Sequence, residues 1–469
     1  MGRDWTAYLM KPGSAAGKQR EWFGHPAGLT ILFLTDMWEK FSYFGLRALL
    51  IYYMTKELLI GQQQASMIYG LYTAAAYFTP IVGGIIADRF LDKRAAVITG
   101  GSIMALGHFI MASTDLFYYG LAAIAIGNGL FLPSLPSQIA GLYRAGDPRV
   151  TSAYSVYYVG TNVGAFLAPL LCGTIGELYG WHWGFGLAGV GMIAGLVTYN
   201  PSGDLLRPVS EAAEHSGVAG GQRAGFSSTL LTQRRFLLLI GIVLVIVVFR
   251  SAYEQVGNTV ALWADEGVDR VISNGSVIPM TWFQSIDPLM VFILTPVLLA
   301  HWARLRRRGS EPSTMTKMSI GALVVAIAYS LLSLVADRAA GNSVAAHWIW
   351  LATFLVIYTA GELYILPVGF GLFGRLAPKG HAATTLAIWY AAIFAGSLLG
   401  GALGTLWSSL TPSQFFLLMA AVAAGASLLL LGFNGAVSRT EDSLRADGHA
   451  QIGAKSRSAT EQQASVAGP

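Results

Sequence analysis

Long apolar runs recur along the chain, and each is close to the length that a membrane-spanning helix needs. About 20 consecutive apolar residues cross the ~30 Å hydrocarbon core of a bilayer as a helix. The runs are continuous and do not alternate in polarity, which excludes a β-barrel. The sequence therefore predicts twelve transmembrane helices, at residues 28–53, 65–88, 94–112, 116–140, 151–174, 182–199, 236–263, 279–303, 317–336, 346–373, 382–408 and 413–434.

A polar stretch with many Gly and Ser residues separates the first six runs from the last six. Two six-helix halves joined by such a linker are typical of the major facilitator fold, in which the substrate site lies near mid-membrane between the halves. After residue 434 the composition turns polar and predicts disorder. The predicted parts are an N-terminal tail (1–27), an N-terminal bundle (28–199), a linker (200–235), a C-terminal bundle (236–434) and a disordered tail (435–469).

Composition and charge agree with an integral membrane protein. Of the 469 residues 54% are hydrophobic and only 12% are charged, about half the charged share of a soluble domain. The net charge of +5 reports topology, because Lys and Arg are concentrated in every second loop. The positive-inside rule then places both termini in the cytoplasm, by default of a bacterial inner (plasma) membrane, and no nucleic-acid partner is expected. Nothing before the first span resembles a cleaved signal.

Charged side chains inside the predicted spans are the main candidates for chemistry. A charge at mid-bilayer costs at least ~2.5 kcal/mol, so such groups should face a protein interior or a wet cavity and pair with one another. Static salt bridges between the halves are one explanation, but buried ion pairs stabilise poorly compared with apolar packing. A carboxylate that makes and breaks such a pair can carry a proton. The eight residues are Asp36, Glu39, Lys40, Arg47, Arg250, Glu254, Asp287 and Glu362.

Spacing indicates which of these charges can meet. Asp36, Glu39 and Lys40 are three and four residues apart and share one helical face, with Arg47 two turns further along it. Arg250 and Glu254 are also one turn apart, which allows a direct ion pair. The segment "DMWEKFSYFG" is therefore interpreted as a proton-sensitive switch.

Six segments in order along the chain resemble the proton-dependent oligopeptide transporter (POT) family. They are "GHPAGLTILFLTDMWEKFSYFGLRALL", "GLFLPSLPSQIAGLY", "YYVGTNVGAFLAPLLCGTIGELYGWHWGFGLAGVGM", "FRSAYEQVGNTVALWAD", "WFQSIDPLM" and "GELYILPVGFGL". The resemblance covers residues 22–433. It implies uptake of di- and tripeptides by proton symport and alternating access, by a protein that works as a monomer.

The resemblance also implies roles for individual residues. Arg47 matches the arginine that meets the peptide carboxylate, Glu362 the acid that receives the peptide amino terminus, and Glu254 an acid linked to proton coupling. Other residues match the family's cavity, its proton-coupling motif, or its cytoplasmic gate, the last in "GGIIADRFLDKR". The expected sets are Asp36, Glu39, Lys40, Arg250 and Glu254 for proton coupling; Tyr43, Arg47, Tyr77, Asn162, Asp287, Glu362, Trp389 and Tyr390 for substrate; and Asp88, Arg89 and Arg94 for the gate.

The chain departs from the family pattern at charged positions. Lys40 replaces an arginine, and Leu132 stands where the fourth helix usually has a lysine. Arg250 replaces an aromatic residue, and Asp287 replaces an asparagine. We expect the cluster of Arg250, Glu254 and Asp287 to have taken over part of the proton coupling. The departures leave two alternatives open, transport of another small anion or metabolite and a peptide sensor that does not transport.

Several other classes do not fit the sequence. No GxxxxGK[ST] loop is present, so an ATP-driven pump is not expected. The eight His residues lack ligand spacing, and Cys172 is the only cysteine, so neither a metal site nor a disulfide is expected. An intramembrane aspartyl protease needs two acids that share a proton, but it would not need two halves with several cations. The expected protein is not an enzyme and uses no cofactor, with protons as its coupling ion.

Overall fold

The computed structural model describes residues 21–466, apart from residues 23, 145–146, 208–233, 273–274 and 378–381. Most of the predicted linker at 200–235 and most of the predicted N-terminal tail lie outside these residues.

The N-terminal half is a bundle of long helices. A two-residue antiparallel pairing of β1 (Glu21–Trp22) with β2 (His25–Pro26) precedes it. Three of its helices continue into further helical turns near their ends, and Pro169 begins one of these turns. The helices are α1 (Ala27–Tyr52) with η2 (Tyr53–Glu57), α2 (Gln62–Phe90), α3 (Lys93–Ile110), α4 (Phe117–Ser134), α5 (Arg149–Ala168) with η6 (Pro169–Gly173) and α6 (Thr174–Tyr179), and α7 (Trp181–Tyr199) with η7 (Asn200–Leu206).

The C-terminal half repeats this plan with one helix broken in the middle. The break follows Tyr253, where a short 3₁₀ turn, η9 (Glu254–Gly257), separates α10 from α11. β3 (Val268–Asp269) and β4 (Ala346–His347) pair in parallel. The helices are α10 (Arg234–Tyr253), α11 (Thr259–Glu266), α12 (Ile286–Arg307) after η10 (Met280–Ser285), α13 (Thr314–Gly341), α14 (Trp348–Leu376), α15 (Ala382–Gly404) with η11 (Thr405–Ser408), and α16 (Pro412–Val466).

Each of the twelve ranges predicted to span the membrane is occupied by a helix. Among the described residues, nine helical segments are both long and apolar enough to cross a bilayer. Helix α1 is not one of the nine, and it carries four of the charged residues singled out above. Its charges therefore depend on partners inside the protein.

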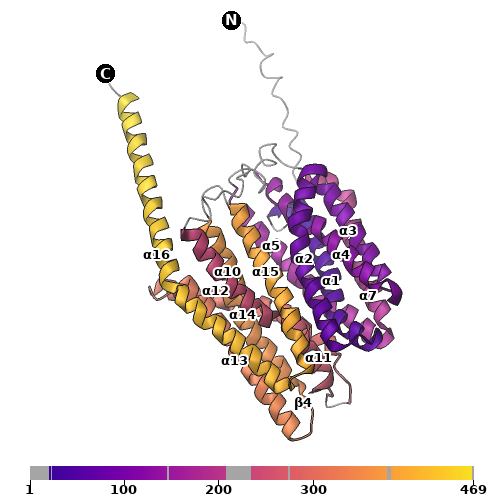
Figure 1. Ribbon diagram of the computed structural model, residues 1–469. Coiled ribbons are helices and arrows are strands. Elements are labelled where there is room, and N and C mark those ends of the chain that lie inside the picture. The colour runs from indigo at the N-terminus through magenta and orange to yellow at the C-terminus, as the bar shows by residue number, and fades with distance from the viewer. Residues whose placement is uncertain are drawn as a thin grey trace, which may run out of the picture.

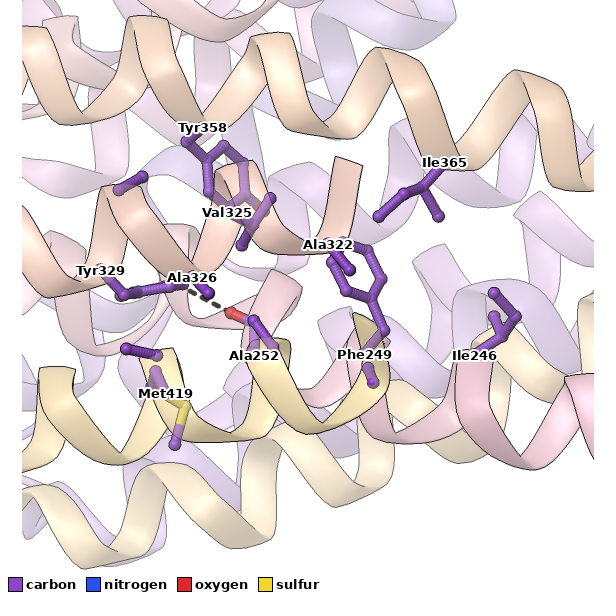
Figure 2. Packing of buried hydrophobic residues seen from close by; sticks show 14 of the residues in the cluster. Ile246, Phe249, Ala252, Ala322, Val325, Ala326, Tyr329, Tyr358, Ile365 and Met419 are labelled. Carbon is purple, nitrogen blue, oxygen red and sulfur yellow. Dashed lines mark hydrogen bonds between the residues drawn. The ribbon is translucent and has the colours of Figure 1, made fainter. Parts of the chain in front are cut away.

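Each half has its own apolar core. In the C-terminal half, Phe249, Val325 and Met419 come from three different helices and pack together (Figure 2). Tyr329 buries its ring there and donates a hydrogen bond to the carbonyl oxygen of Ala252 at 2.7 Å. The N-terminal half relies on close helix contacts as well: a Cβ at Gly164 of α5 would lie 2.1 Å from the Met37 carbonyl oxygen of α1. This close approach places the charged face of α1 against α5.

The two halves are joined at the end of the molecule opposite the linker, here called the far end. The opposite end, where α7 ends and α10 begins, is called the linker end. Helices α2 and α15 run side by side across the interface (Figure 1). Several polar contacts close the far end: Tyr52 to the Ala261 carbonyl (2.9 Å), Gln62 to the Gly404 carbonyl (2.9 Å), Ser66 to Asn258 (2.8 Å), Thr281 to Glu177 (2.6 Å) and Lys56 to Asp265 (2.6 Å).

The C-terminal segment differs from its predicted disorder. Helix α16 is continuous over 55 residues from Pro412 to Val466 and projects past the other helices (Figure 1). The segment 435–466 contains many Ala, Arg, Glu and Gln residues, which are good helix formers, and it has no proline to stop the helix. Glu441 near its base accepts hydrogen bonds from Thr314 and Arg375. Polar composition excluded a packed core here but did not exclude a helix.

Candidate functional site

The charged motif of α1 forms a buried cluster in the N-terminal half. Asp36 accepts hydrogen bonds from Tyr157 and Thr161, both at 2.5 Å and both on one face of α5. The Lys40 ammonium lies 2.6 Å from Glu39. Asp36 and Glu39 are both buried. The predicted common face of these residues is therefore present, with α5 covering it.

Arg47 leaves this cluster and reaches across to the other half. Its Nη2 donates to Glu254 Oε2 at 2.9 Å, and its Nε donates to the Tyr69 hydroxyl at 2.8 Å. The Arg47 guanidinium therefore connects α1 and α2 to η9. This ion pair is one of the contacts that hold the two halves together.

Glu254 lies between two arginines. Arg250 approaches Oε1 at 2.6 Å, and Ser397 of α15 donates to the same oxygen at 3.0 Å. The Glu254 side chain is 2% exposed, so these partners compensate a charge that water does not reach. The Arg250 guanidinium also lies 4.0 Å from the Tyr253 ring centre and donates a long hydrogen bond of 3.4 Å to Tyr77. The predicted pairing of Arg250 with Glu254 is present.

Asp287 does not join this pair directly, contrary to the expected three-residue cluster. It lies in the first turn of α12, where Thr359 donates to its Oδ1 at 2.6 Å. Its carboxyl group contacts that of Glu362 on α14. Tyr253 donates to Glu362 Oε1 at 2.9 Å. Asp287 is two helices away in sequence from Glu362, so helix packing and not local spacing brings the two acids together.

A pocket between the halves is lined by some of these groups. Arg47 lines it from the N-terminal half, and Asp287 and Tyr253 line it from the C-terminal half. Apolar side chains form most of the remaining wall, as is usual for a small-molecule site. The lining residues are Phe44, Arg47, Ala165, Pro169, Tyr253, Val256, Gly257, Gln284, Asp287, Pro288 and Tyr358.

The other predicted substrate residues are spread around this region. Tyr43 is buried and stacks on Tyr72 with ring centres 6.3 Å apart. Asn162 is buried, and its amide nitrogen donates to the Tyr158 carbonyl in its own helix. Tyr390 is 36% exposed.

Trp389 was predicted as a cavity residue beside Tyr390 but belongs to the core of the C-terminal half. It is 3% exposed and packs against Phe370 and Phe373 of α14. Neighbouring residues on a helix point about 100° apart, and here Trp389 points into the core whereas Tyr390 is partly exposed. In this structure the predicted aromatic pair is therefore split.

The predicted gate residues lie at the linker end. Asp88 and Arg89 are exposed in the last turn of α2, and Arg94 is in the first turn of α3. Arg94 donates to the carbonyl oxygen of Asn200, which follows α7 in the same half. Leu132, the position of the usual lysine, is half-buried in α4.

Several residues that hold the charges were missed by sequence reasoning. Tyr157 and Thr161 are one turn apart on α5, a spacing that could have suggested a polar face opposite the acids of α1. Tyr69, Thr359 and Ser397 sit singly in apolar helices, and only the packing of those helices shows what they bind. These neutral donors complete the site.

The comparisons with known proteins agree with this architecture. Residues 94–204 and 222–418 match the sequence profile of the POT family. The chain is 30% identical to the peptide transporter YePEPT of Yersinia enterocolitica, over 82% of this chain and 88% of that protein. It is 31% identical to the transporter YclF of Bacillus subtilis, over 88% and 95%.

Among solved structures, the peptide transporter POT in complex with sulfate superposes with a TM-score of 0.80 and 28% identity, covering 90% of this chain and 97% of that one. The predicted family resemblance and the predicted helical, major-facilitator-like membrane fold are thereby confirmed. This chain is an integral membrane protein and belongs to the POT family of transporters, not to a family of enzymes.

Proposed function

We propose that the chain is a symporter that couples the entry of di- and tripeptides to protons and works by alternating access. The observation that carries this proposal is the placement of opposite charges on opposite halves: Arg47 and Asp287 line one pocket, and Glu362 contacts Asp287. A peptide zwitterion needs a cation for its carboxylate and an anion for its amino group. The names of the peptide-transporting relatives support the same substrate class.

In this proposal Arg47 changes partner during transport. It pairs with Glu254 in the empty protein and binds the peptide carboxylate in the loaded one, while Glu362 receives the peptide amino group. Because the Arg47–Glu254 pair joins the halves, the exchange loosens one of the contacts between them. The acids Asp36 and Glu39, beside Lys40, supply a buried group that can take up the coupling proton.

The closed far end fits an inward-facing state. We place the linker end and both chain termini in the cytoplasm of a bacterial cell and the far end in the periplasm, following the distribution of Lys and Arg. Asp88, Arg89 and Arg94 would then close the cytoplasmic side in the opposite state. A single chain contains both halves of the pocket, which supports function as a monomer.

The test is uptake of labelled dialanine into liposomes that contain the purified protein, with and without an inward proton gradient. We expect gradient-stimulated uptake, lost in Arg47→Ala and Glu362→Ala and kept in the control Arg338→Ala, whose side chain is exposed on α13. Gradient-independent uptake would refute the coupling.

Absence of dialanine uptake by the folded wild type would refute peptide transport. A thermal-shift screen would then identify the alternative. Stabilisation by peptides without flux would indicate a sensor, and stabilisation by other small anions or metabolites would indicate a different substrate.

A further inference from the structure

The contact between Asp287 and Glu362 brings together two groups that cannot hydrogen-bond as carboxylates. Thr359 and Tyr253 each donate to one oxygen of the pair, to Asp287 Oδ1 and Glu362 Oε1. Glu362 Oε2 is buried and has no donor among the residues that the structure describes. An ionised carboxylate only accepts hydrogen bonds, so this contact needs a proton on one of the two acids.

The charged groups around Asp287 and Glu362 do not remove the need for a proton on one of them. Arg47 from α1 and Arg250 from α10 face it, but both guanidinium groups bind Glu254. The other ionisable side chains that face the pair are neutral hydroxyl groups: Tyr253 from α10, Tyr158 from α5 and Tyr358 from α14 itself. The nearby cations are therefore already engaged by another acid.

We propose that Asp287 and Glu362 share one proton in the empty site and release it when the ammonium group of a substrate binds between them. The inference rests on the proposed function, because it assigns Glu362 to the peptide amino group. The bond that breaks is the carboxylic O–H, and the proton passes to water in the pocket. The N–H groups of the ammonium then donate to the two carboxylates in its place. The two acids together with the ammonium then carry the same charge as the protonated pair did, and the pocket with its bound zwitterion is one unit more negative by the proton released.

This exchange separates two kinds of proton movement. A proton that leaves the pair when the substrate arrives is not the proton that travels with the substrate. The coupling proton must then be carried elsewhere, and the cluster of Asp36, Glu39 and Lys40 in the N-terminal half is a second buried set of acids. Glu254 is less suited to this task, since two arginines and Ser397 already satisfy its negative charge.

Titration calorimetry of dialanine binding, repeated in two buffers with different ionisation enthalpies, counts the protons released. We expect the wild type to release close to one proton for each peptide bound. Asp287→Asn should still bind dialanine but release none, because an amide can donate to Glu362 but has no proton that ionises near neutral pH. The matched control Asp337→Asn, at an exposed position on α13, should release as many protons as the wild type. Binding without release by the wild type, or unchanged release by Asp287→Asn, would overturn the proposal.

Infrared spectroscopy of the peptide-free protein tests the shared proton without any substrate. The carbonyl stretch of a protonated carboxylic acid should lose intensity in Asp287→Asn and in Glu362→Gln, and keep it in Asp337→Asn. If both pocket variants keep the wild-type band, the pair holds no proton and the inference fails. If the band behaves as expected but dialanine does not bind, the shared proton stands, and it is the assignment of the peptide substrate that fails.

Discussion

Arg47 of α1 donates to Glu254 of η9 at 2.9 Å, across the interface between the two halves of the protein. Both side chains are largely excluded from water. The pair connects the two halves, which must move apart for transport. A substrate carboxylate that binds Arg47 has to replace Glu254. The free-energy cost of this replacement depends on how well the remaining partners of Glu254 compensate its negative charge once Arg47 has left.

Arg250 pairs with Glu254 and can neutralise its charge after Arg47 has left. We therefore predict that Arg250→Ala weakens substrate binding. In the variant, Glu254 keeps Arg47 as its only cation and holds it more tightly against the incoming carboxylate. A charge-assisted hydrogen bond contributes about 1.5–3 kcal/mol, which corresponds to a KM increase of roughly 10- to 100-fold. Proton-driven dialanine uptake over a range of peptide concentrations measures the change.

The control for this experiment is Arg338→Ala, which removes an arginine from an exposed position. Unchanged proton-driven uptake by Arg250→Ala would show that the arginine gained at this position plays no part in coupling or binding.

Close backbone contact between α2 and α15 should make far-end closure sensitive to added volume. A Cβ at Gly70 would lie 2.4 Å from the Cα of Gly401, and neither atom can move without shifting a helix. We predict that Gly70→Val keeps the halves from closing at the far end and reduces uptake by at least about tenfold. Gly425→Val is the matched control, because a Cβ at Gly425 meets nothing within 4 Å. Equal uptake by the two variants would contradict this account of closure.

Chemical cross-linking at the far end gives a second test of alternating access. Gln63 donates to Ser408 across the interface at 3.1 Å, and both lie at the exposed rim. In a Cys172→Ser background, cysteines at positions 63 and 408 should cross-link under oxidation and stop dialanine uptake. A reducing agent should restore the uptake. In the same double-cysteine protein, Gly70→Val should lower the yield of the cross-link. Uptake that continues in fully cross-linked protein would refute opening at this end.

Local spacing predicted the parts of the site that lie on a single helix. The common face of Asp36, Glu39 and Lys40 and the pair of Arg250 with Glu254 both follow from the helical repeat. Each apolar run likewise marked a range in which the structure has helix, because bilayer thickness fixes the length of such runs.

Local spacing could not predict contacts between helices that are distant in the sequence. Asp287 was assigned to the arginine cluster but contacts Glu362, since the packing of α12 on α14 decides which acid it meets. Trp389 was assigned to the cavity by resemblance, yet its direction on α15 takes it into the core. The outcome at α16 shows a different limit, because a polar composition does not distinguish disorder from a solvated helix.

Glu311, in the loop between α12 and α13, makes part of the stability depend on pH. Its carboxylate accepts hydrogen bonds from Arg306 at 2.7 Å and from Lys317 at 2.6 Å. These two cations lower the pKa of Glu311 from 4.5 to about 2. A carboxyl group whose pKa is lower in the folded protein stabilises it above the unfolded pKa, and this contribution is lost as the pH falls towards the folded pKa.

We therefore predict that Glu311→Gln lowers the stability of the purified protein by about 1 kcal/mol at pH 7, a value reduced for solvent screening at this partly exposed site. The difference in Tm between wild type and variant should persist down to about pH 5, shrink as the pH falls below about 4.5, and vanish near pH 2. Thermal unfolding in detergent across this range measures it. Glu266→Gln, at an exposed position at the end of α11, is the matched control. A Tm difference for Glu311→Gln that stays constant with pH would mean that its carboxylate is not stabilised by Arg306 and Lys317.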